Sequence, residues 1–446
     1  MMTHPWRLLL ALAAVAVLAA ACAEDPDIAD PTDDDVDEPD EPDDEPDDPD
    51  DEPDEPEDEG AHEGEEITVW IMQPGSDTLE EMLEGYTEEF EEEHGADVTL
   101  TFQPWDDAHD AFTTALAGDD VPDVAEMGTT WTPEFGVLGA FAEQDLGDED
   151  YIDAVVDTGA PEGEPLGVPW YAAARALIYN VEVFEDLGLE PPETWDELVE
   201  VGETIQAETD MYAYGVVGAG ANHFVLPRVW QAGGEIAEPD NDSWTATINE
   251  PEGVEAFEHY TDLFTEHEFA PEGALGWTVA DAQEAFTQED LAMFQGLGAN
   301  VDAVEAGNED LEVGVALLPE GPGGNRDTFA GGSHLVRFAD SEAPEAAQAY
   351  IDFLMTDERV AEFSEEIGFF PGTEEGIDAL DLDERGEVFA EMLTEHSRSY
   401  PPTAEWGAFE GDDLFVNAVQ EIMQGDAEVS EALDEIAEEM DAAFQE

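Results

Sequence analysis

Residues 67–72, ITVWIM, form a short apolar run typical of a buried β-strand, and the folding signals of the chain begin there. Through residues 79–90, apolar side chains then recur at helical spacing, with mostly glutamate between them. Residues 98–102 alternate as a second strand, residues 108–116 indicate a second helix, and PDVAEM at 122–127 indicates a third strand. This order predicts a mainly parallel sheet covered by helices, and so an α/β fold.

A second α/β unit is expected from about residue 176. ALIYN at 176–180 is typical of a strand, and Thr194 with Glu197 forms a capping box that opens a helix. Three later runs also have the composition of strands: LAMFQG (291–296), VGVALLP (313–319) and SHLVRF (333–338). The C-terminal third is expected to be helical. A chain of 446 residues exceeds what one hydrophobic core usually fills, so two domains are expected.

The charge of the chain is extreme, with 120 aspartates and glutamates against eight basic residues, all of them arginine. The formal net charge of -112 resembles that of proteins from salt-loving organisms. A nucleic-acid partner is excluded, because binding phosphates needs a basic face that these few arginines cannot build. We interpret the acidity as an adaptation to brine, since molar salt shortens the Debye length to about 3 Å.

The N-terminus has the features of an export signal. One arginine precedes an apolar run from Leu8 to Ala21, which is too short to span a bilayer. Its end, LAAAC, resembles a bacterial lipobox, which predicts a lipoprotein signal peptide over residues 1–22 and a lipid on Cys22, the only cysteine of the chain. The alternative is an ordinary cleaved signal. Residues 23–66, nearly all Asp, Glu and Pro, predict a disordered acidic tether.

Several segments lack acids although acids dominate the rest of the chain. They are MGTTWTP (127–133) and residues 165–181, 211–234, 291–301 and 328–339. Some of these residues are expected to be buried strands and helices. Others combine Trp, Tyr or His with Gly, Asn, Thr and Arg, which suits a sugar, because its C–H faces stack on rings and its hydroxyls need donors and acceptors.

The later motifs resemble the extracellular sugar-binding proteins of ABC importers, the solute-binding protein family 1 that includes maltose-binding protein. The most specific part is GVPWYAAARALIYNVEVFEDLGLEPPETWDELVE, which starts at residue 167. QEAFTQEDLAMFQG, the block from AGGSHLVRF to GFFPGT, and YPPTAEW are also similar to the family, in the same order. Within it, the GVPWYAA form most resembles binders of chitobiose and other oligosaccharides.

The resemblance implies a two-lobed periplasmic-binding-protein fold, with a ligand cleft between the lobes and three crossings of the chain. The crossings are expected near residues 172–176, 315–319 and 364–372. Lobe 1 would then comprise residues 67–173 plus 318–365, and lobe 2 residues 174–317 plus 366–446. The implied function is to capture a neutral di- or oligosaccharide outside the cell and deliver it to a membrane permease. The protein would be a lipid-anchored monomer at the outer face of the cytoplasmic membrane, without a cofactor.

The resemblance also implies where the ligand binds. Trp170 and Tyr171 would lie at the mouth of the cleft, and residues 73–76 and the turn at 130–131 would supply contacts from lobe 1. The segment ANHF (221–224) and Trp406 would contribute from lobe 2. The expected ligand-binding residues are Gln73, Trp105, Thr130, Trp131, Trp170, Tyr171, Arg175, Asn222, His223, Trp230, Ser333 and Trp406.

Three of these residues have a structural alternative. Trp230 could belong to the core, Arg175 could form an ion pair at the crossing, and Trp105 could cap its strand. In addition, many relatives carry a tryptophan after the strand that resembles LAMF, whereas this chain has GLGAN there. One stacking surface of the family is therefore expected to be missing.

Two other functions stay open at this stage. A glycoside hydrolase needs two positioned carboxylates, and no such pair stands in a recognisable motif. The nine histidines show no metal-binding spacing either, so neither catalytic residues nor a metal site are expected. A binding protein for a charged solute of the polyamine or glycerol-phosphate type is the other alternative. Phosphorylated ligands would call for an arginine cluster, and the acidic field would slow the approach of anions.

Overall fold

The computed structural model describes residues 60–118, 121–147, 149–161, 163–241 and 243–445. The predicted signal peptide, Cys22 and the predicted tether up to residue 59 lie outside the described residues. The last residues of the predicted tether do not belong to it, because they pack on the folded part. The amide of Gly60 donates to the carbonyl of Glu93, that of His62 donates to His94, and Glu66 pairs with Asp97 in the first sheet.

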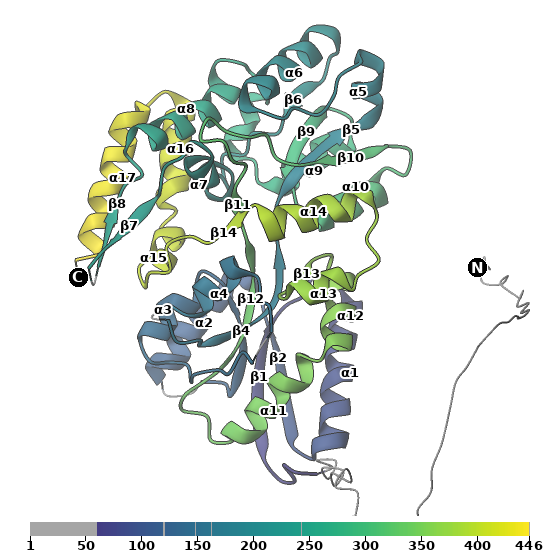
Figure 1. Ribbon diagram of the computed structural model, residues 1–446, viewed down its shortest axis with the longest axis vertical. Coiled ribbons are helices and arrows are strands. Elements are labelled where there is room, and N and C mark those ends of the chain that lie inside the picture. The colour runs from purple at the N-terminus through teal and green to yellow at the C-terminus, as the bar shows by residue number, and fades with distance from the viewer. Residues whose placement is uncertain (1–59, 119–120, 148, 162, 242, 446) are drawn as a thin grey trace, which may run out of the picture. The chain divides into compact units, whose positions relative to one another are not determined.

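Lobe 1 is built on a six-stranded sheet with the order β13-β4-β12-β3-β1-β2 (Figure 1). Its strands are β1 (Glu66–Met72), β2 (Asp97–Gln103), β3 (Val124–Gly128), β4 (Gly167–Ala173), β12 (Gly331–Arg337) and β13 (Phe370–Pro371). β1, β2 and β3 run parallel, as their sequence pattern predicts, whereas β12 is antiparallel to both β3 and β4. The carboxyl ends of β1, β3 and β4 therefore lie at the same edge as the start of β12.

Seven helices pack around this sheet. They are α1 (Asp77–His94), α2 (Trp105–Gly118), α3 (Thr132–Val137), α4 (Asp153–Gly159), α11 (Pro344–Leu354), α12 (Asp357–Ile367) and α13 (Glu374–Asp378). α1 begins where the Ser76 hydroxyl accepts from the amide of Leu79, and ends at Gly95, whose φ of 80° favours glycine. Its buried residues, including Leu79, Leu83 and Phe90, follow the helical periodicity of the sequence.

Lobe 2 contains a four-stranded sheet of order β10-β5-β9-β6. These strands are β5 (Ala176–Asn180), β6 (Tyr212–Tyr214), β9 (Leu291–Gly296) and β10 (Val313–Ala316). Two small two-stranded sheets accompany it, β7 (Ala237–Asp240) with β8 (Ser243–Ala246), and β11 (Thr328–Phe329) with β14 (Ser397–Arg398). Its helices are α5 (Val181–Leu187), α6 (Trp195–Glu208), α7 (Asn222–Gln231), α8 (Pro251–Thr265), the 3-10 helix η1 (Glu272–Gly276), α9 (Val279–Thr287), α10 (Gly298–Gly307), α14 (Glu384–Glu395), α15 (Trp406–Gly411), α16 (Leu414–Gln424) and α17 (Val429–Ala443).

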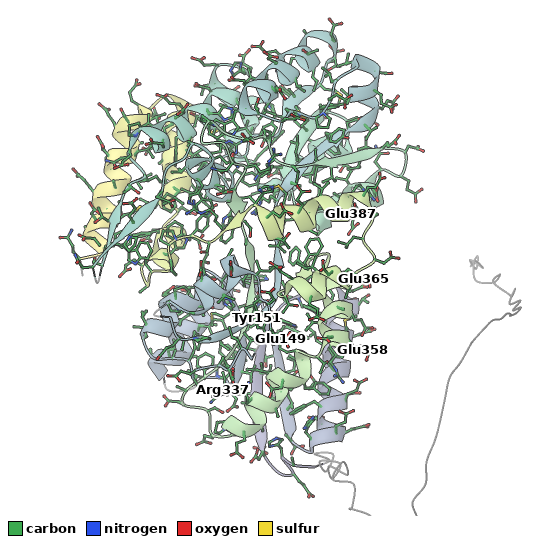
Figure 2. The ribbon with its side chains drawn as sticks, in the orientation of Figure 1. Glu149, Tyr151, Arg337, Glu358, Glu365 and Glu387 are labelled. Atoms are coloured by element: carbon green, nitrogen blue, oxygen red, sulfur yellow. The ribbon has the colours of Figure 1, made fainter. Side chains whose placement is uncertain are left out.

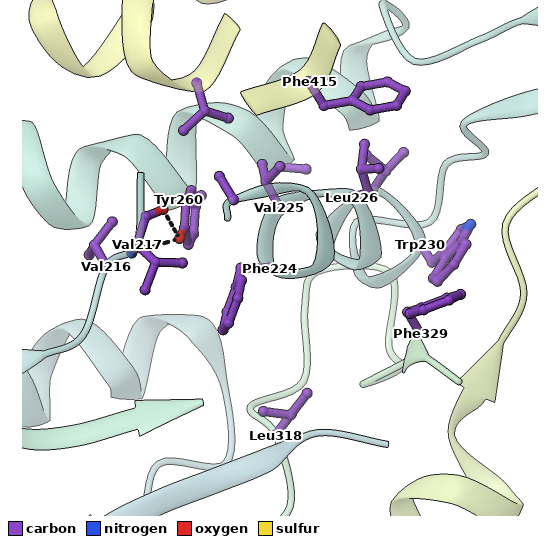
Figure 3. Close-up of a cluster of buried hydrophobic side chains, with 14 of the residues drawn as sticks. Val216, Val217, Phe224, Val225, Leu226, Trp230, Tyr260, Leu318, Phe329 and Phe415 are labelled. Carbon is purple, nitrogen blue, oxygen red and sulfur yellow. Dashed lines mark hydrogen bonds between the residues drawn. The ribbon is translucent and has the colours of Figure 1, made fainter. Parts of the chain in front are cut away.

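Figure 3 shows part of the lobe 2 core around α7. Phe224, Val225 and Leu226 project from this helix and are nearly inaccessible to solvent. The hydroxyl of Tyr260 on α8 donates to the carbonyl of Val217 and accepts from its amide, so the loop before α7 is held against α8. The acid-free composition of residues 211–234 is explained in large part by this burial.

The chain crosses between the lobes three times, but two crossings lie later than the sequence predicts. The first is at residues 174–175, between β4 and β5. The second lies at Ala330 instead of residues 315–319, because residues 318–329 still pack on lobe 2. The side chain of Gln231 donates to the carbonyl of Asp327, and the amide of Glu320 donates to Glu193.

The third crossing, predicted at residues 364–372, lies between α13 and α14. β13 still pairs with β4, and α13 packs on β13 and α12, so this stretch belongs to lobe 1. Of the described residues, those within 60–173 and 331–378 thus form lobe 1, and those within 176–329 and 384–445 form lobe 2. Figure 1 shows α14 alongside the lobe 2 sheet and α13 in lobe 1.

Acidic side chains cover the surface, as the exposed Glu358, Glu365 and Glu387 illustrate (Figure 2). Few of them have a cationic partner within the described residues. Only four arginines form ion pairs there, namely Arg326, Arg359, Arg385 and Arg398. Among the helices of the described ranges, none has both the length and the apolar character that crossing a bilayer requires.

Candidate functional site

A cavity of about 610 Å³ opens between the lobes, at the carboxyl ends of β1, β3 and β4. This is the edge at which α/β proteins commonly bind ligands. Lobe 1 contributes most of the lining, and lobe 2 with the first crossing contributes the remainder. The residues around it are Met72, Gln73, Pro74, Gly75, Trp105, Glu126, Tyr171, Ala173, Arg175, His223, Leu297, Phe329, Gly331, Gly332, Ser333, Phe363, Ile367 and Phe369.

A buried carboxyl group, Glu126 on β3, forms the floor of the cavity. Its Oε1 atom accepts from the hydroxyls of Tyr171 at 2.5 Å and Ser333 at 2.6 Å, and its Oε2 atom accepts from the amide of Met72 at 2.9 Å. Burial raises the pKa of Glu126, and these three hydrogen bonds oppose the rise. The network fixes Tyr171 and Ser333, which come from β4 and β12, in the floor.

The lobe 2 side of the cavity carries a guanidinium group and an imidazole. Arg175 sits at the first crossing with its Cζ atom 5.2 Å from the centre of the Phe224 ring, and no carboxylate of the described chain pairs with it. His223 on α7 lies with its Nδ1 atom 2.9 Å from the hydroxyl of Tyr400. Burial, reinforced by the charge of Arg175, lowers the pKa of His223 to about 3, so the imidazole is neutral at neutral pH.

Aromatic rings form the walls. Trp105 at the start of α2 is 41 % exposed, and its ring centre is 5.5 Å from that of Trp131 behind it. Phe363 and Phe369, at either side of the end of α12, line the cavity near Tyr171, with ring centres 5.9 Å and 5.6 Å from it. A large ring that stays exposed in an otherwise acidic surface is the kind of group that stacks on a sugar.

Six of the twelve residues expected from the sequence line this cavity: Gln73, Trp105, Tyr171, Arg175, His223 and Ser333. They come from both lobes and from six different elements or loops, so only the tertiary structure brings them together. Two of the structural alternatives do not hold. Arg175 lacks the expected ion pair in the described chain, and Trp105 is the first residue of a helix with its ring in the cavity.

Three expected tryptophans lie in the protein interior. For Trp170 and Trp406 this corrects the expected ligand contact, and for Trp230 it agrees with the core alternative. Trp170 is 1 % exposed under α12, and Trp406 is 1 % exposed with its ring against Tyr400 and Phe415. Trp230 is 2 % exposed, because the guanidinium of Arg398 covers its ring at 4.9 Å. Each lies inside a helix or strand that the rest of its lobe covers.

Thr130, Trp131 and Asn222 are not among the residues that line the cavity. Trp131 supports Trp105 from behind, and Asn222 is the residue before His223 at the start of α7. Thr130 is near the carboxyl group of Glu410 on α15, so it takes part in a contact between the lobes. Burial raises the pKa of Glu410 to about 7, and the side chains of Thr130 and Trp406 oppose this rise.

The sequence analysis missed Glu126 and three phenylalanines of the lining, Phe329, Phe363 and Phe369. Glu126 was recognisable in principle, because it is one acid within an otherwise apolar buried strand, and buried acids often have a function. Phe363 could not be told from an ordinary core residue, since it occupies an apolar position of an amphipathic helix.

The cavity does not offer the pair of carboxylates that glycoside hydrolysis requires. Glu126 is the only acid among its lining residues in the described chain, and three hydrogen bonds occupy its oxygens. One group with the composition of a metal site, Glu391, Glu395 and His396, lies elsewhere, at the end of α14, and two of its members are exposed. The arrangement is suited to hold a ligand by stacking and hydrogen bonding.

Comparisons with known proteins agree with this arrangement. The family model of the bacterial extracellular solute-binding proteins matches residues 75–361. The diacetylchitobiose binding protein DasA of Streptomyces coelicolor is 28 % identical over 363 residues, which cover 79 % of this chain and 83 % of that protein.

Among solved structures, a solute-binding protein of Thermotoga lettingae bound with alpha-D-tagatose has a TM-score of 0.72 and 26 % identity, covering 85 % of this chain and 100 % of that one. The cyclic alpha-maltosyl-1,6-maltose binding protein of Arthrobacter globiformis has a TM-score of 0.71 and 25 % identity, covering 85 % of this chain and 98 % of that one. The predicted family and the predicted two-lobed α/β fold are confirmed.

Proposed function

Because the chain belongs to the bacterial extracellular solute-binding proteins, we propose that it captures a neutral di- or oligosaccharide between its lobes and delivers it to an ABC permease. The observation that carries this proposal is the composition of the cavity, in which an exposed tryptophan and three phenylalanines surround a hydrogen-bonded polar floor. Relatives named for the sugars they bind, among them diacetylchitobiose and arabinooligosaccharides, support it.

In this proposal Trp105 stacks on a sugar ring, and Tyr171 and Ser333 accept hydrogen bonds from its hydroxyls. Gln73, Arg175 and His223 provide further polar contacts around the cavity. The volume of about 610 Å³ suits a short oligosaccharide, within the usual range of small-molecule sites. Trp131 acts indirectly, as the support of Trp105.

The test is a thermal-shift screen of the purified protein against neutral sugars in molar salt, with a polyamine and a sugar phosphate in the same panel. Binding of a neutral sugar raises the melting temperature in proportion to the logarithm of its concentration. A shift with the polyamine or the phosphate alone would reject the proposal.

The proposal includes that the protein releases the sugar unchanged, because the cavity lining contains a single, fully hydrogen-bonded carboxyl group. Incubation with each bound sugar, followed by chromatography of the products, tests this part. Appearance of smaller sugars at many turnovers per protein would show that the protein is a hydrolase.

We further propose that Cys22 carries lipid and that the acidic segment after it holds the lobes away from the membrane. The support is the position of this lone cysteine, directly after an apolar run and before a segment of Asp, Glu and Pro. Fractionation of cells that express the wild type or Cys22→Ser is the test. Retention of Cys22→Ser in the membrane fraction to the same extent would contradict lipidation at this residue.

A further inference from the structure

The lobe 2 wall of the cavity offers hydrogen-bond donors that no acceptor of the described chain uses. Arg175 lines the cavity, and its guanidinium forms neither an ion pair nor a hydrogen bond with a described residue. Its Nε atom is fully buried, so the two terminal amino groups are the part of the side chain that can reach a ligand. A guanidinium has five N–H donors and no acceptor.

His223 adds a second donor beside Arg175. Its Nδ1 atom is 2.9 Å from the hydroxyl of Tyr400, which is 1 % exposed and has no other hydrogen-bonding partner in the described chain. The Tyr400 hydroxyl therefore donates to Nδ1, since its proton would otherwise be buried without an acceptor. In a neutral imidazole the proton then resides on Nε2, which makes His223 a donor toward the cavity.

The floor on the lobe 1 side has the opposite polarity. The hydroxyl protons of Tyr171 and Ser333 both point to Glu126 Oε1, so toward a ligand these two side chains offer lone pairs only. The hydroxyl groups of a sugar can serve this floor as donors. The lobe 2 wall needs an acceptor, because its strongest donor, the charged guanidinium of Arg175, has no partner among the described residues.

An apolar surface adjoins the donors. The ring of Phe329 stacks on the imidazole of His223, with centres 4.9 Å apart and planes at 6°, and the half-buried Leu297 also lines the cavity. The lobe 2 wall thus combines two fixed donors with an apolar patch. An acetamido group has the complementary parts, because its carbonyl accepts and its methyl group is apolar.

Building on the proposed function, we propose that the cavity selects a sugar with an N-acetyl group, whose carbonyl oxygen accepts from Arg175 and His223 and whose methyl group packs on Phe329 and Leu297. A carboxylate could also pair with Arg175, but it would have to enter a cavity with the Glu126 carboxyl in its floor, on a chain of net charge -112. A plain hydroxyl is a weaker acceptor and lacks the methyl group.

The experiment compares matched sugars by calorimetry in 2 M salt. Two pairs differ mainly at position 2, glucose with N-acetylglucosamine and cellobiose with N,N′-diacetylchitobiose, and glucuronic acid is the acidic probe. We expect each acetylated sugar to bind at least about tenfold more tightly than its partner. Equal or weaker binding of the acetylated sugars, or tighter binding of glucuronic acid, would overturn the proposal while sugar binding itself stands. Failure of every sugar, including a wider neutral panel, would reject the proposed function.

Arg175→Gln tests the residue assignment. This variant is expected to reduce the ratio of the two affinities in each pair to about one, whereas damage to the fold would weaken both sugars alike and leave the ratio unchanged. Arg326→Gln is the matched control, because Arg326 pairs with Glu320 on lobe 2 outside the cavity. The control should keep the wild-type ratio. An Arg175→Gln variant that keeps the wild-type ratio of the two affinities would show that Arg175 does not bind the acetamido group.

Discussion

The ring of Phe363 stacks face to face on the indole of Trp170, with ring centres 4.5 Å apart and planes at 4°. Phe363 comes from α12 and Trp170 from β4, so this pair holds the second segment of lobe 1, residues 331–378, against its sheet. All seven residues of β4 are buried, and Phe363 rather than Trp170 lines the cavity. Trp170, which belongs to the motif GVPWYAA, therefore lies in the core and supports Phe363 in the cavity wall.

Trp170→Ala is expected to act mainly on stability. Removing a buried tryptophan leaves a cavity under α12 and should lower the free energy of unfolding by about 3–5 kcal/mol. Urea unfolding at a fixed salt concentration of 2 M measures the effect. A loss below about 1 kcal/mol together with abolished sugar binding would restore Trp170 as a direct ligand contact.

Trp105→Ala should have the opposite profile. Its ring is 41 % exposed, so the variant is expected to unfold within about 0.5 kcal/mol of the wild type while its sugar affinity falls by about 1–3 kcal/mol. Calorimetry with the best sugar of the panel measures this loss. Trp131→Ala is a useful comparison, because removing the support behind Trp105 should weaken binding less than removing Trp105 itself.

The carboxyl group of Glu410 should make stability depend on pH. Burial raises its pKa from the ordinary 4.5 to about 7, so the stability that it contributes is complete below about pH 4.5 and is lost as the pH rises through 7. Glu410→Gln does not titrate. Between pH 5 and pH 8, the free energy of unfolding of the variant should therefore rise by about 2 kcal/mol relative to that of the wild type, after allowance for the partial exposure of Glu410.

The measurement is urea unfolding across this pH range at constant molar salt, with Glu405→Gln as a control for the loss of one negative charge in the same segment. If the free energies of unfolding of the wild type and Glu410→Gln changed in parallel from pH 5 to pH 8, the carboxyl group of Glu410 would not be held in the buried environment that the structure shows.

Stability should also depend strongly on salt. More than ninety acids remain after the predicted tether is removed, whereas the four paired arginines neutralise few of them. At 0.01 M salt the Debye length is about 30 Å, so repulsion adds up over the surface and exceeds what a marginal stability of about 5–15 kcal/mol tolerates.

The melting temperature is therefore expected to rise steeply between 0.05 M and 2 M salt, in the full chain and in a chain that lacks the tether alike. A melting temperature that stays constant over this range would contradict adaptation to brine. A rise in the full chain only would assign the effect to the tether.

The predicted parallel strands of lobe 1 are confirmed. They were predictable because short apolar runs that alternate with amphipathic helices are a local property of the sequence. Residues 67–72 and 122–127 were expected as strands and lie in or overlap β1 and β3, and the capping Thr194 accepts from the amide of Glu197 at 3.3 Å. These features depend on side chains a few positions apart. The crossings were placed less well, since residues 318–329 and 370–378 are held by contacts with distant parts of their lobes.

The sequence by itself determined the α/β class, the family and the acidity, because periodicity, motif order and composition are properties of neighbouring residues. The resemblance to the family also placed Gln73, Tyr171 and Arg175 among the expected ligand-binding residues. Only the tertiary structure decided which rings face the cavity. Trp105 and Trp170 look alike in sequence, yet α12 covers one and leaves the other exposed. Burial depends on the elements that the chain brings back over a residue, and a single sequence does not show these.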